Sequence, residues 1–217
     1  MVPIFITGIG TGIGKTLVSA VLAEALQSDY WKPVQAGYTK GTDSEWMKTV
    51  ISNNQSRIHP ELYIFKLAVS PHIASKAEGI EISIQNISDE YERLFSLSSQ
   101  TVGSGILIEG AGGLLVPLNE NEFVIDLIEK LNARVILVSR NYLGSINHSL
   151  LTAQICKQRN INVIGWIFND QYLDYEDKIS YWSGYRKLAS IPRLEMINKE
   201  TIAAQAMQLR NNLVSII

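Results

Sequence analysis

Short apolar runs alternate along the chain with segments that have the apolar spacing of helices. The runs are rich in β-branched residues and have the length of buried strands, and the segments between them repeat apolar residues every three or four positions. Strands are predicted at residues 4–8, 30–37, 105–109, 134–138 and 163–168. Helices are predicted at residues 17–26 and 45–50, from residue 71, at residues 84–97, 123–131 and 143–158, beyond residue 172, and over about the last twenty residues. At least five strands that alternate with helices favour an α/β fold, with a mainly parallel sheet covered by helices on both faces.

The first predicted strand runs into a glycine-rich loop. Every second residue from Gly8 to Gly14 is a glycine, and Lys15-Thr16 follows at the start of a helical segment. Glycines permit positive φ and let backbone N–H groups converge on an anion, and the positive end of the helix points to the same place. This order predicts a P-loop NTPase, in which Lys15 reaches the outer phosphates of a nucleotide and the Thr16 hydroxyl coordinates magnesium.

The spacing of this loop departs from the general P-loop pattern by one residue. Five residues separate Gly8 from Gly14, where the general motif has four. A dinucleotide-binding fingerprint fits less well, because Ile13 stands where its third glycine belongs and Gly-Lys-Thr has no use there. The remaining alternative is a glycine-rich turn with an exposed lysine, and the strand and helix on either side argue against it.

Charged residues stand at or near the ends of two further predicted strands. The carboxyl ends of parallel strands border the ligand crevice of an open sheet, so Lys32 is a candidate second cation. Its position is equally compatible with a solvated edge lysine. Glu109 ends an apolar run and precedes the loop Gly110-Ala111-Gly112-Gly113. A carboxylate there can complete a magnesium shell while the glycines let the backbone approach a ligand, whereas a solvated glutamate leaves the glycines unexplained.

Polar residues at the starts of three predicted helices have the chemistry of caps. Asp43, Ser70 (followed by Pro71) and Ser145 are predicted N-caps. A nucleotide site would also make Asp43 a magnesium ligand, and the free amides near Ser145 would suit a ligand carboxylate. The pair Asn169-Asp170 follows a predicted strand and either reads a nucleotide base or turns the chain.

Composition narrows the class of partner. A hydrophobic content of 46% supports one domain over residues 1–217, and 19 Lys and Arg against 21 Asp and Glu argue for a small substrate and against nucleic acid. Cys156 is the single cysteine, which excludes disulfides within the chain and cysteine metal clusters, so core packing is expected for it. The sequence shows neither a signal-peptide pattern nor an apolar run long enough to cross a bilayer, so we expect a cytoplasmic protein without a membrane partner.

Together, these stretches resemble the ATP-dependent dethiobiotin synthetases, which have a P-loop NTPase fold. The resemblance covers most of the chain, and the extra residue in the glycine loop is a feature of that family. Five stretches carry it: the loop from Gly8 to Thr16, Lys32-Pro33-Val34, residues 109–113, Leu143-Gly144 with Ile146-Asn147-His148, and Gly165-Trp166 with Asn169-Asp170; Ser70-Pro71-His72 also matches.

The resemblance implies a ligase reaction of biotin biosynthesis. CO2 and 7,8-diaminononanoate are joined at the expense of ATP, giving dethiobiotin, ADP and phosphate. One amine captures CO2 as a carbamate, ATP phosphorylates the carbamate, and the second amine attacks the mixed anhydride to close the ring. The family works as a homodimer with sites at the interface, uses Mg²⁺ and needs no protein nucleophile.

The resemblance also implies a role for each matching residue. The catalytic residues would be Thr11, Lys15 and Lys32, and the magnesium ligands would be Thr16, Asp43 and Glu109. ATP would contact Gly12, Ile13, Gly14, Lys15, Thr16, Leu17, Asp43, Glu109, Gly110, Ala111, Gly112, Asn169, Asp170, Pro192, Arg193 and Leu194. The substrate would contact Lys32, Ala36 and Gly112, and its carboxylate would be held by Leu143, Gly144, Ser145, Ile146 and Asn147 of the other subunit.

Two positions depart from the family pattern. Gly12 stands where many members have a glutamate near the metal, and Ala36 stands where they have a hydroxyl that touches the substrate. The loss of one hydrogen bond costs about 0.5 to 1.5 kcal/mol if nothing replaces it, so we expect weaker substrate binding, with a changed diamine as the alternative.

Two other functions compete with this interpretation. A partitioning or cluster-assembly ATPase switch would carry a signature lysine five residues before the Gly-Lys-Thr lysine, where this chain has Gly10. A nucleotide-binding module without catalysis would leave Lys32 and Glu109 unexplained.

Overall fold

A computed structural model of the chain describes residues 2–39, 41–98, 105–170 and 174–213. Its main sheet has six parallel strands in the order β2-β5-β1-β6-β7-β8, so the N-terminal strand lies inside the sheet. The strands are β1 (Ile4–Gly8), β2 (Asp29–Trp31), β5 (Ile106–Glu109), β6 (Arg134–Arg140), β7 (Val163–Asn169) and β8 (Lys187–Ile191). This arrangement confirms the predicted α/β class and the mainly parallel sheet.

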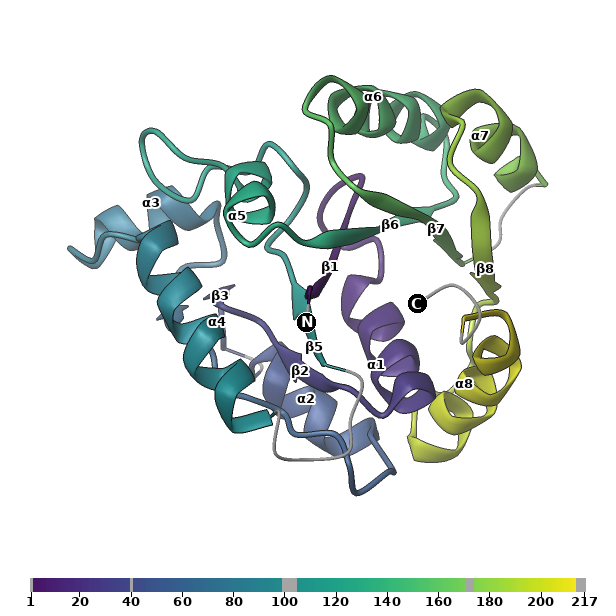
Figure 1. Ribbon diagram of the computed structural model, residues 1–217, viewed down its shortest axis with the longest axis horizontal. Coiled ribbons are helices and arrows are strands. Elements are labelled where there is room, and N and C mark those ends of the chain that lie inside the picture. The colour runs from purple at the N-terminus through teal and green to yellow at the C-terminus, as the bar shows by residue number, and fades with distance from the viewer. Residues whose placement is uncertain (1, 40, 99–104, 171–173, 214–217) are drawn as a thin grey trace.

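Helices cover both faces of this sheet. They are α1 (Lys15–Leu26), α2 (Asp43–Val50), α3 (Pro71–Ala77), α4 (Ile84–Ser98), α5 (Val124–Lys130), α6 (Ser145–Gln158), α7 (Glu176–Ser183) and α8 (Lys199–Leu213). The helices α1 and α8 lie together on one side of the sheet, and α6 and α7 lie on the other (Figure 1). The part of α8 up to Leu213 lies where the C-terminal helix is predicted, and residues 214–217 fall outside the described residues.

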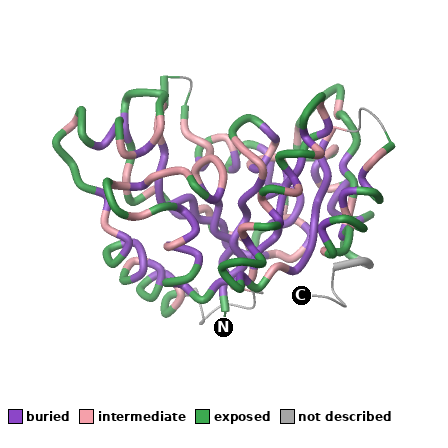
Figure 2. Tube along the Cα trace, turned by 90° about the horizontal axis from the view of Figure 1, so that it is seen from above, coloured by how far each residue is buried: buried purple, intermediate pink, exposed green. Residues whose placement is uncertain are grey.

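Successive side chains on a strand point to opposite faces of the sheet and pack into two separate hydrophobic cores. Ile4 and Ile6 of β1 pack with α1, α2 and α8, whereas Phe5 between them packs with the helices of the other face. The buried segments run through the centre of the molecule and the exposed ones lie outside (Figure 2). Cys156 is fully buried in the second of these cores, as its predicted packing role requires. In the part of the chain that the structure describes, no helix has the length and apolarity needed to span a membrane.

The predicted strand at 30–37 is wrong as one element. It is split at Lys32-Pro33 into β2 of the main sheet and β3 (Val34–Ala36), which pairs with β4 (Tyr63–Phe65) in a separate two-stranded sheet. Proline has no N–H to donate to a ladder, and the Pro33 carbonyl accepts hydrogen bonds from the amides that lead into β4. The strands β4 and β8 are not among those predicted from the sequence.

Two predicted helix caps are also wrong. Thr42, not Asp43, caps α2, since its side chain accepts the Glu45 amide at 3.2 Å while the Glu45 carboxylate accepts the Thr42 amide. This capping box frees the Asp43 carboxylate for another partner. Gly144, with φ of 99°, precedes α6 in place of Ser145, whose hydroxyl accepts the Tyr142 amide.

Candidate active site

The loop after β1 is held against neighbouring strands and folds around the Lys15 side chain. Lys15 is buried, and its Nζ donates to the Gly10 carbonyl at 2.8 Å. Positive φ occurs at Gly12 (72°) and Gly14 (92°), whereas a Cβ on Gly8 would collide with the Val138 carbonyl oxygen. The glycines therefore serve different purposes, conformation at two positions and close approach of strands at a third.

A cluster of charged and polar side chains lies next to this loop. Lys32 forms ion pairs with the Asp43 carboxylate and with Glu109, whose Oε1 is 3.5 Å from the Lys32 Nζ. The Thr16 hydroxyl donates to the same Glu109 oxygen at 2.9 Å, and the Tyr30 hydroxyl donates to the other at 2.9 Å. The structure thus brings together the predicted lysine, hydroxyl and carboxylates.

Strand register explains why these residues meet. Trp31 of β2 pairs with Ile108 of β5, so the next residues along the chain, Lys32 and Glu109, lie side by side at the ends of these strands. Because β1 is the other neighbour of β5, the same edge carries the glycine loop. Asp43 arrives from the first turn of α2. Tyr30 is a site residue that sequence reasoning missed, because it stands inside a strand with no motif around it.

Burial and charge move the pKa values of the two lysines in opposite directions. Burial lowers the pKa of Lys15 to about 8, against a raising effect of Glu109. Burial also acts to lower the pKa of Lys32, but the carboxylates of Glu109 and Asp43 outweigh it and leave that pKa above its usual value. Burial, followed by the charge of Glu109, raises the pKa of Tyr30 well above its ordinary range, so Tyr30 stays a donor to Glu109.

The lowered pKa of Lys15 predicts a stability cost that depends on pH. The Lys15 ammonium loses its proton more readily in the folded chain than in the unfolded chain. Its charge therefore lowers the free energy of unfolding fully below about pH 8, and this effect disappears as pH rises towards 10.5. We expect Lys15→Met to raise the free energy of unfolding by up to about 3 kcal/mol at pH 7, and by much less near pH 10. Denaturant unfolding of the ligand-free protein at both pH values measures this. The prediction is contradicted if Lys15→Met does not raise the free energy of unfolding at pH 7, or raises it equally at pH 7 and pH 10. Lys178→Met, at an exposed position, is the control.

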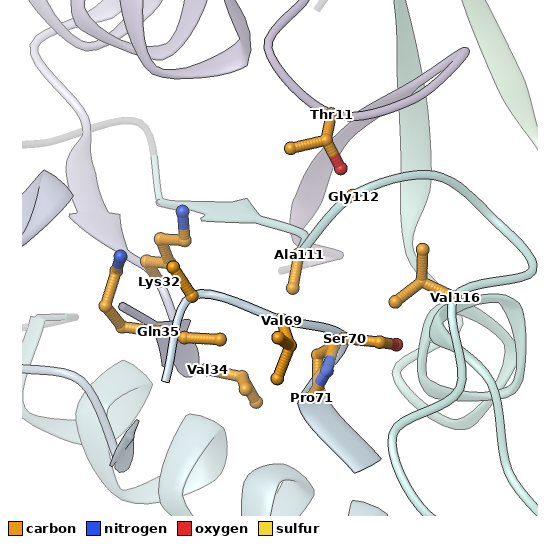
Figure 3. A pocket seen from close by; sticks show the side chains of 12 residues that line it. Thr11, Lys32, Val34, Gln35, Val69, Ser70, Pro71, Ala111, Gly112 and Val116 are labelled. Atoms are coloured by element: carbon orange, nitrogen blue, oxygen red, sulfur yellow. The ribbon is translucent and has the colours of Figure 1, made fainter. Parts of the chain in front are cut away.

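A cavity of about 420 Å³ opens beside Lys32. Lys32 and Gln35 lie on one side of it, with Thr11 of the glycine loop above and Val116 opposite (Figure 3). Its lining consists of Thr11, Lys32, Val34, Gln35, Ala36, Ala68, Val69, Ser70, Pro71, Ala111, Gly112 and Val116. Four predicted substrate or catalytic residues, Thr11, Lys32, Ala36 and Gly112, therefore share one cavity. Ser70 stands at the N-cap position of α3, but its hydroxyl lies 3.0 Å from His72 Nδ1 and makes no capping bond.

A second cavity, of about 530 Å³, lies on the other side of the glycine loop. Its lining is Thr11, Gly12, Ile13, Arg140, Asn141, Tyr142, Asp170 and Arg193. Arg140, which sequence reasoning missed, binds the Asp170 carboxylate through two nitrogens at 2.6 and 3.0 Å. Asn169 uses its Nδ2 to donate to the Ile13 carbonyl at 3.0 Å, which ties β7 to the loop.

Other predicted contacts are not part of these two linings. Gly110 packs so closely on Phe5 that a Cβ would collide with the ring, which is a structural reason for glycine there. Leu17 is half-buried and packs on the core beneath α1. Pro192, Leu194 and the turn from Leu143 to Asn147 line neither cavity within one chain. Leu143 is 99% exposed.

Comparisons with known proteins show what the chain as a whole is similar to. A family model described as an AAA domain matches residues 3–201. A relative from Cytophaga hutchinsonii, named ATP-dependent dethiobiotin synthetase BioD, is 49% identical over 209 residues, which cover 96% of this chain and 97% of the relative. A relative of the same name from Christiangramia forsetii is 41% identical over 214 residues, 98% of each chain.

Solved structures share the fold at much lower identity. A ParA family ATPase from Chlorobium tepidum has a TM-score of 0.55 at 16% identity and covers 94% of this chain and 97% of its own. The septum site-determining protein MinD from Pyrococcus horikoshii, complexed with Mg-ADP, has a TM-score of 0.56 at 16% identity and covers 96% and 88%. Likeness at this identity establishes the P-loop NTPase fold alone.

Proposed function

The chain belongs to the ATP-dependent dethiobiotin synthetase family, and we propose that it joins CO2 to 7,8-diaminononanoate with ATP, forming dethiobiotin, ADP and phosphate. The observation that carries this proposal is the place of Lys32, which lies between Asp43 and Glu109 and lines the 420 Å³ cavity together with Thr11 of the glycine loop. A cation at that point serves a reaction in which a negatively charged group in the cavity attacks a phosphate on the loop.

The proposed reaction has three steps. One amine adds to CO2 and loses a proton, which gives a carbamate. A carbamate oxygen attacks the γ-phosphorus, the bond from that phosphorus to the bridging oxygen breaks, and ADP leaves. The second amine then attacks the carbonyl carbon, phosphate leaves with the C–O electron pair, and loss of a proton completes the cyclic urea. No step requires a covalent bond to the protein.

The protein would act in these steps by position and charge. Lys32 would neutralise the carbamate and Lys15 the γ-phosphoryl oxygens, while Thr11 at the cavity mouth would orient the group that moves between them. The pKa of Lys32 lies above its usual value, so its ammonium stays charged at neutral pH. Lys15, with a pKa of about 8, would be charged more fully once phosphates lie beside it.

We propose Thr16, Asp43 and Glu109 as the residues that hold Mg²⁺. Their donor atoms are hydroxyl and carboxylate oxygens, which suit this hard cation. The three side chains already lie together, because Thr16 donates to Glu109, and both Glu109 and Asp43 pair with Lys32. In the described part of the chain no three His, Cys, Asp or Glu side chains form a metal cluster, so the remaining ligands would come from the nucleotide and water. Bound Mg²⁺ would neutralise developing phosphate charge.

The 530 Å³ cavity is the proposed place of the nucleoside. Asn169, the last residue of β7, donates to the carbonyl of Ile13, a residue of the cavity lining. The cavity joins the glycine loop to Asp170 and Arg193. These residues follow β7 and β8, whose carboxyl ends border the crevice of the sheet.

We also propose a homodimer in which the turn from Leu143 to Asn147 reaches the partner's site. Within one chain this turn lines neither cavity, yet it exposes Leu143 almost completely, and Leu115 and Leu151 are 57% and 61% exposed. Leu115 and Leu151 line one hollow together, and a contiguous group of exposed apolar side chains is typical of an interface. We propose a cytoplasmic location for this activity, because its co-substrate is ATP.

Release of ADP tests the proposed function. We expect purified protein with Mg-ATP to release ADP only when 7,8-diaminononanoate and bicarbonate are both present, with one dethiobiotin formed per ADP. Omission of either co-substrate is the control. ADP release that DNA stimulates and the diamine leaves unchanged would instead favour an ATPase switch of the partitioning type.

A further inference from the structure

Gln35 stands out among the side chains of the 420 Å³ cavity. It is 8% exposed, and its Nε2 donates to the Gly37 carbonyl at 2.8 Å. Its Oε1 is buried and accepts no hydrogen bond. Of the residues that line this cavity in the described chain, it alone has a buried side-chain polar atom without a partner. A buried acceptor left unpaired is unfavourable, which points to a donor that arrives with the ligand.

The chemistry around Gln35 limits what that ligand group is. Lys32, on the same side of the cavity (Figure 3), offers only N–H donors, and two carboxylates already engage it. Val34 and Ala36 are apolar, and the Ser70 hydroxyl is occupied by His72. An anionic ligand group can therefore pair with Lys32, while a neutral N–H group needs an acceptor, which the carboxamide of Gln35 provides.

We propose that Gln35 is a substrate-positioning residue, whose Oε1 accepts a hydrogen bond from an amine of the diamine bound beside Lys32. This inference rests on the proposed function. The buried Oε1 reaches a ligand when the terminal torsion, which is soft in a glutamine, turns. This turn exchanges the bond from Nε2 to the Gly37 carbonyl for the bond to the ligand, while the residue stays in β3. A neutral amide oxygen holds the amine without fixing a proton on it, as a nucleophile requires.

Gln35→Met tests the proposal, since methionine has similar length and no acceptor of comparable strength. We expect the KM for the diamine to rise about three- to tenfold, the range of one hydrogen bond, with the KM for ATP unchanged within twofold. Calorimetric titration of the diamine into the protein with a non-hydrolysable ATP analogue should show the same loss of affinity. Gln35→Ala repeats the measurement if the methionine variant does not fold.

The chain offers a matched control at Gln205. This glutamine of α8 is 9% exposed, has an unpaired buried Oε1 of its own, and lines neither cavity. Gln205→Met therefore makes the same chemical change at the same degree of burial, and should leave the KM for the diamine unchanged. An equal rise in both variants would indicate a general structural effect and overturn the proposal.

A second substitution separates positioning from packing. Ala36 lines the same cavity, so Ala36→Ser adds a hydroxyl acceptor next to Gln35. We expect Ala36→Ser to lower the diamine KM a few-fold in wild type, as the missing hydroxyl predicts, and by a larger factor in the Gln35→Met background, a coupling that independent sites do not show. If wild type is active and Gln35→Met has an unchanged KM for the diamine, the role of Gln35 is overturned but the proposed function stands. If wild type does not respond to the diamine at all, the proposed function is overturned as well.

Discussion

Lys15→Ala is expected to lower the rate of ADP release by at least about 10³-fold while the protein stays folded. The side chain is buried at the base of the glycine loop, and its Nζ binds the Gly10 carbonyl in the ligand-free state. In phosphoryl transfer almost all of the rate enhancement comes from positioning and charge stabilisation, so removal of a cation at the outer phosphates has a large effect. Single-turnover ADP release at saturating diamine measures it.

Folding of the Lys15→Ala variant is expected to be normal. Burial lowers the pKa of Lys15 to about 8, which means that its charge disfavours the folded state. Circular dichroism and thermal unfolding check this, and Lys178→Ala, at an exposed site on α7, is the control for loss of any lysine. Unchanged ADP release from folded Lys15→Ala protein would exclude the proposed role of the loop.

The second large effect is expected in mixed dimers. A substrate with a carboxylate at one end and a phosphorylated carbamate at the other needs two anion sites roughly 10 Å apart, about the length of an extended nine-carbon chain. We propose the glycine loop as one of them and the amides at the start of α6, beyond Gly144, as the other. Since that turn lines neither cavity of its own chain, a two-fold axis that brings it to the partner's loop would complete both sites.

Complementation between two inactive chains measures this arrangement. One chain carries Lys15→Ala, and the other carries Gly144→Trp, which places a bulky side chain at a φ of 99° that favours glycine. In a mixed dimer with shared sites, one site collects both changes and the other collects none. We expect roughly half of the wild-type activity in the purified mixed dimer. If each site lay within one chain, both would keep one change and the mixed dimer would stay inactive; differently tagged chains verify the exchange.

Local pattern was sufficient for the elements and for the phosphate loop. Glycines at alternate positions followed by Lys15-Thr16 specify an anion-binding turn through backbone chemistry that needs no distant residue. Periodicity located the helices and the longer strands for a similar reason, since apolar spacing is set by the element itself. It failed for β4 and β8, and at Lys32-Pro33, where the change from one sheet to another leaves no mark in the sequence beyond the proline.

Caps and partners required tertiary structure because they depend on choices between neighbouring groups. Thr42 and Asp43 are both residue types that cap helices. Only the folded chain shows that the Thr42 side chain caps α2, while the Asp43 carboxylate pairs with Lys32. Residues without a motif, such as Tyr30 and Arg140, become visible only through their partners, Glu109 and Asp170.

The sequence by itself determined the α/β class, the glycine loop, and the charges that end the neighbouring strands. It did so because each of these features depends only on residues that are adjacent in the sequence. The tertiary structure alone decided that β2, β5 and β1 lie side by side, so that Lys32, Glu109 and Thr16, far apart along the chain, meet at one edge. It also decided that Gln35, a residue of the cavity lining, keeps a buried oxygen without a partner, since pairing depends on every atom around a side chain and burial makes each missing partner costly.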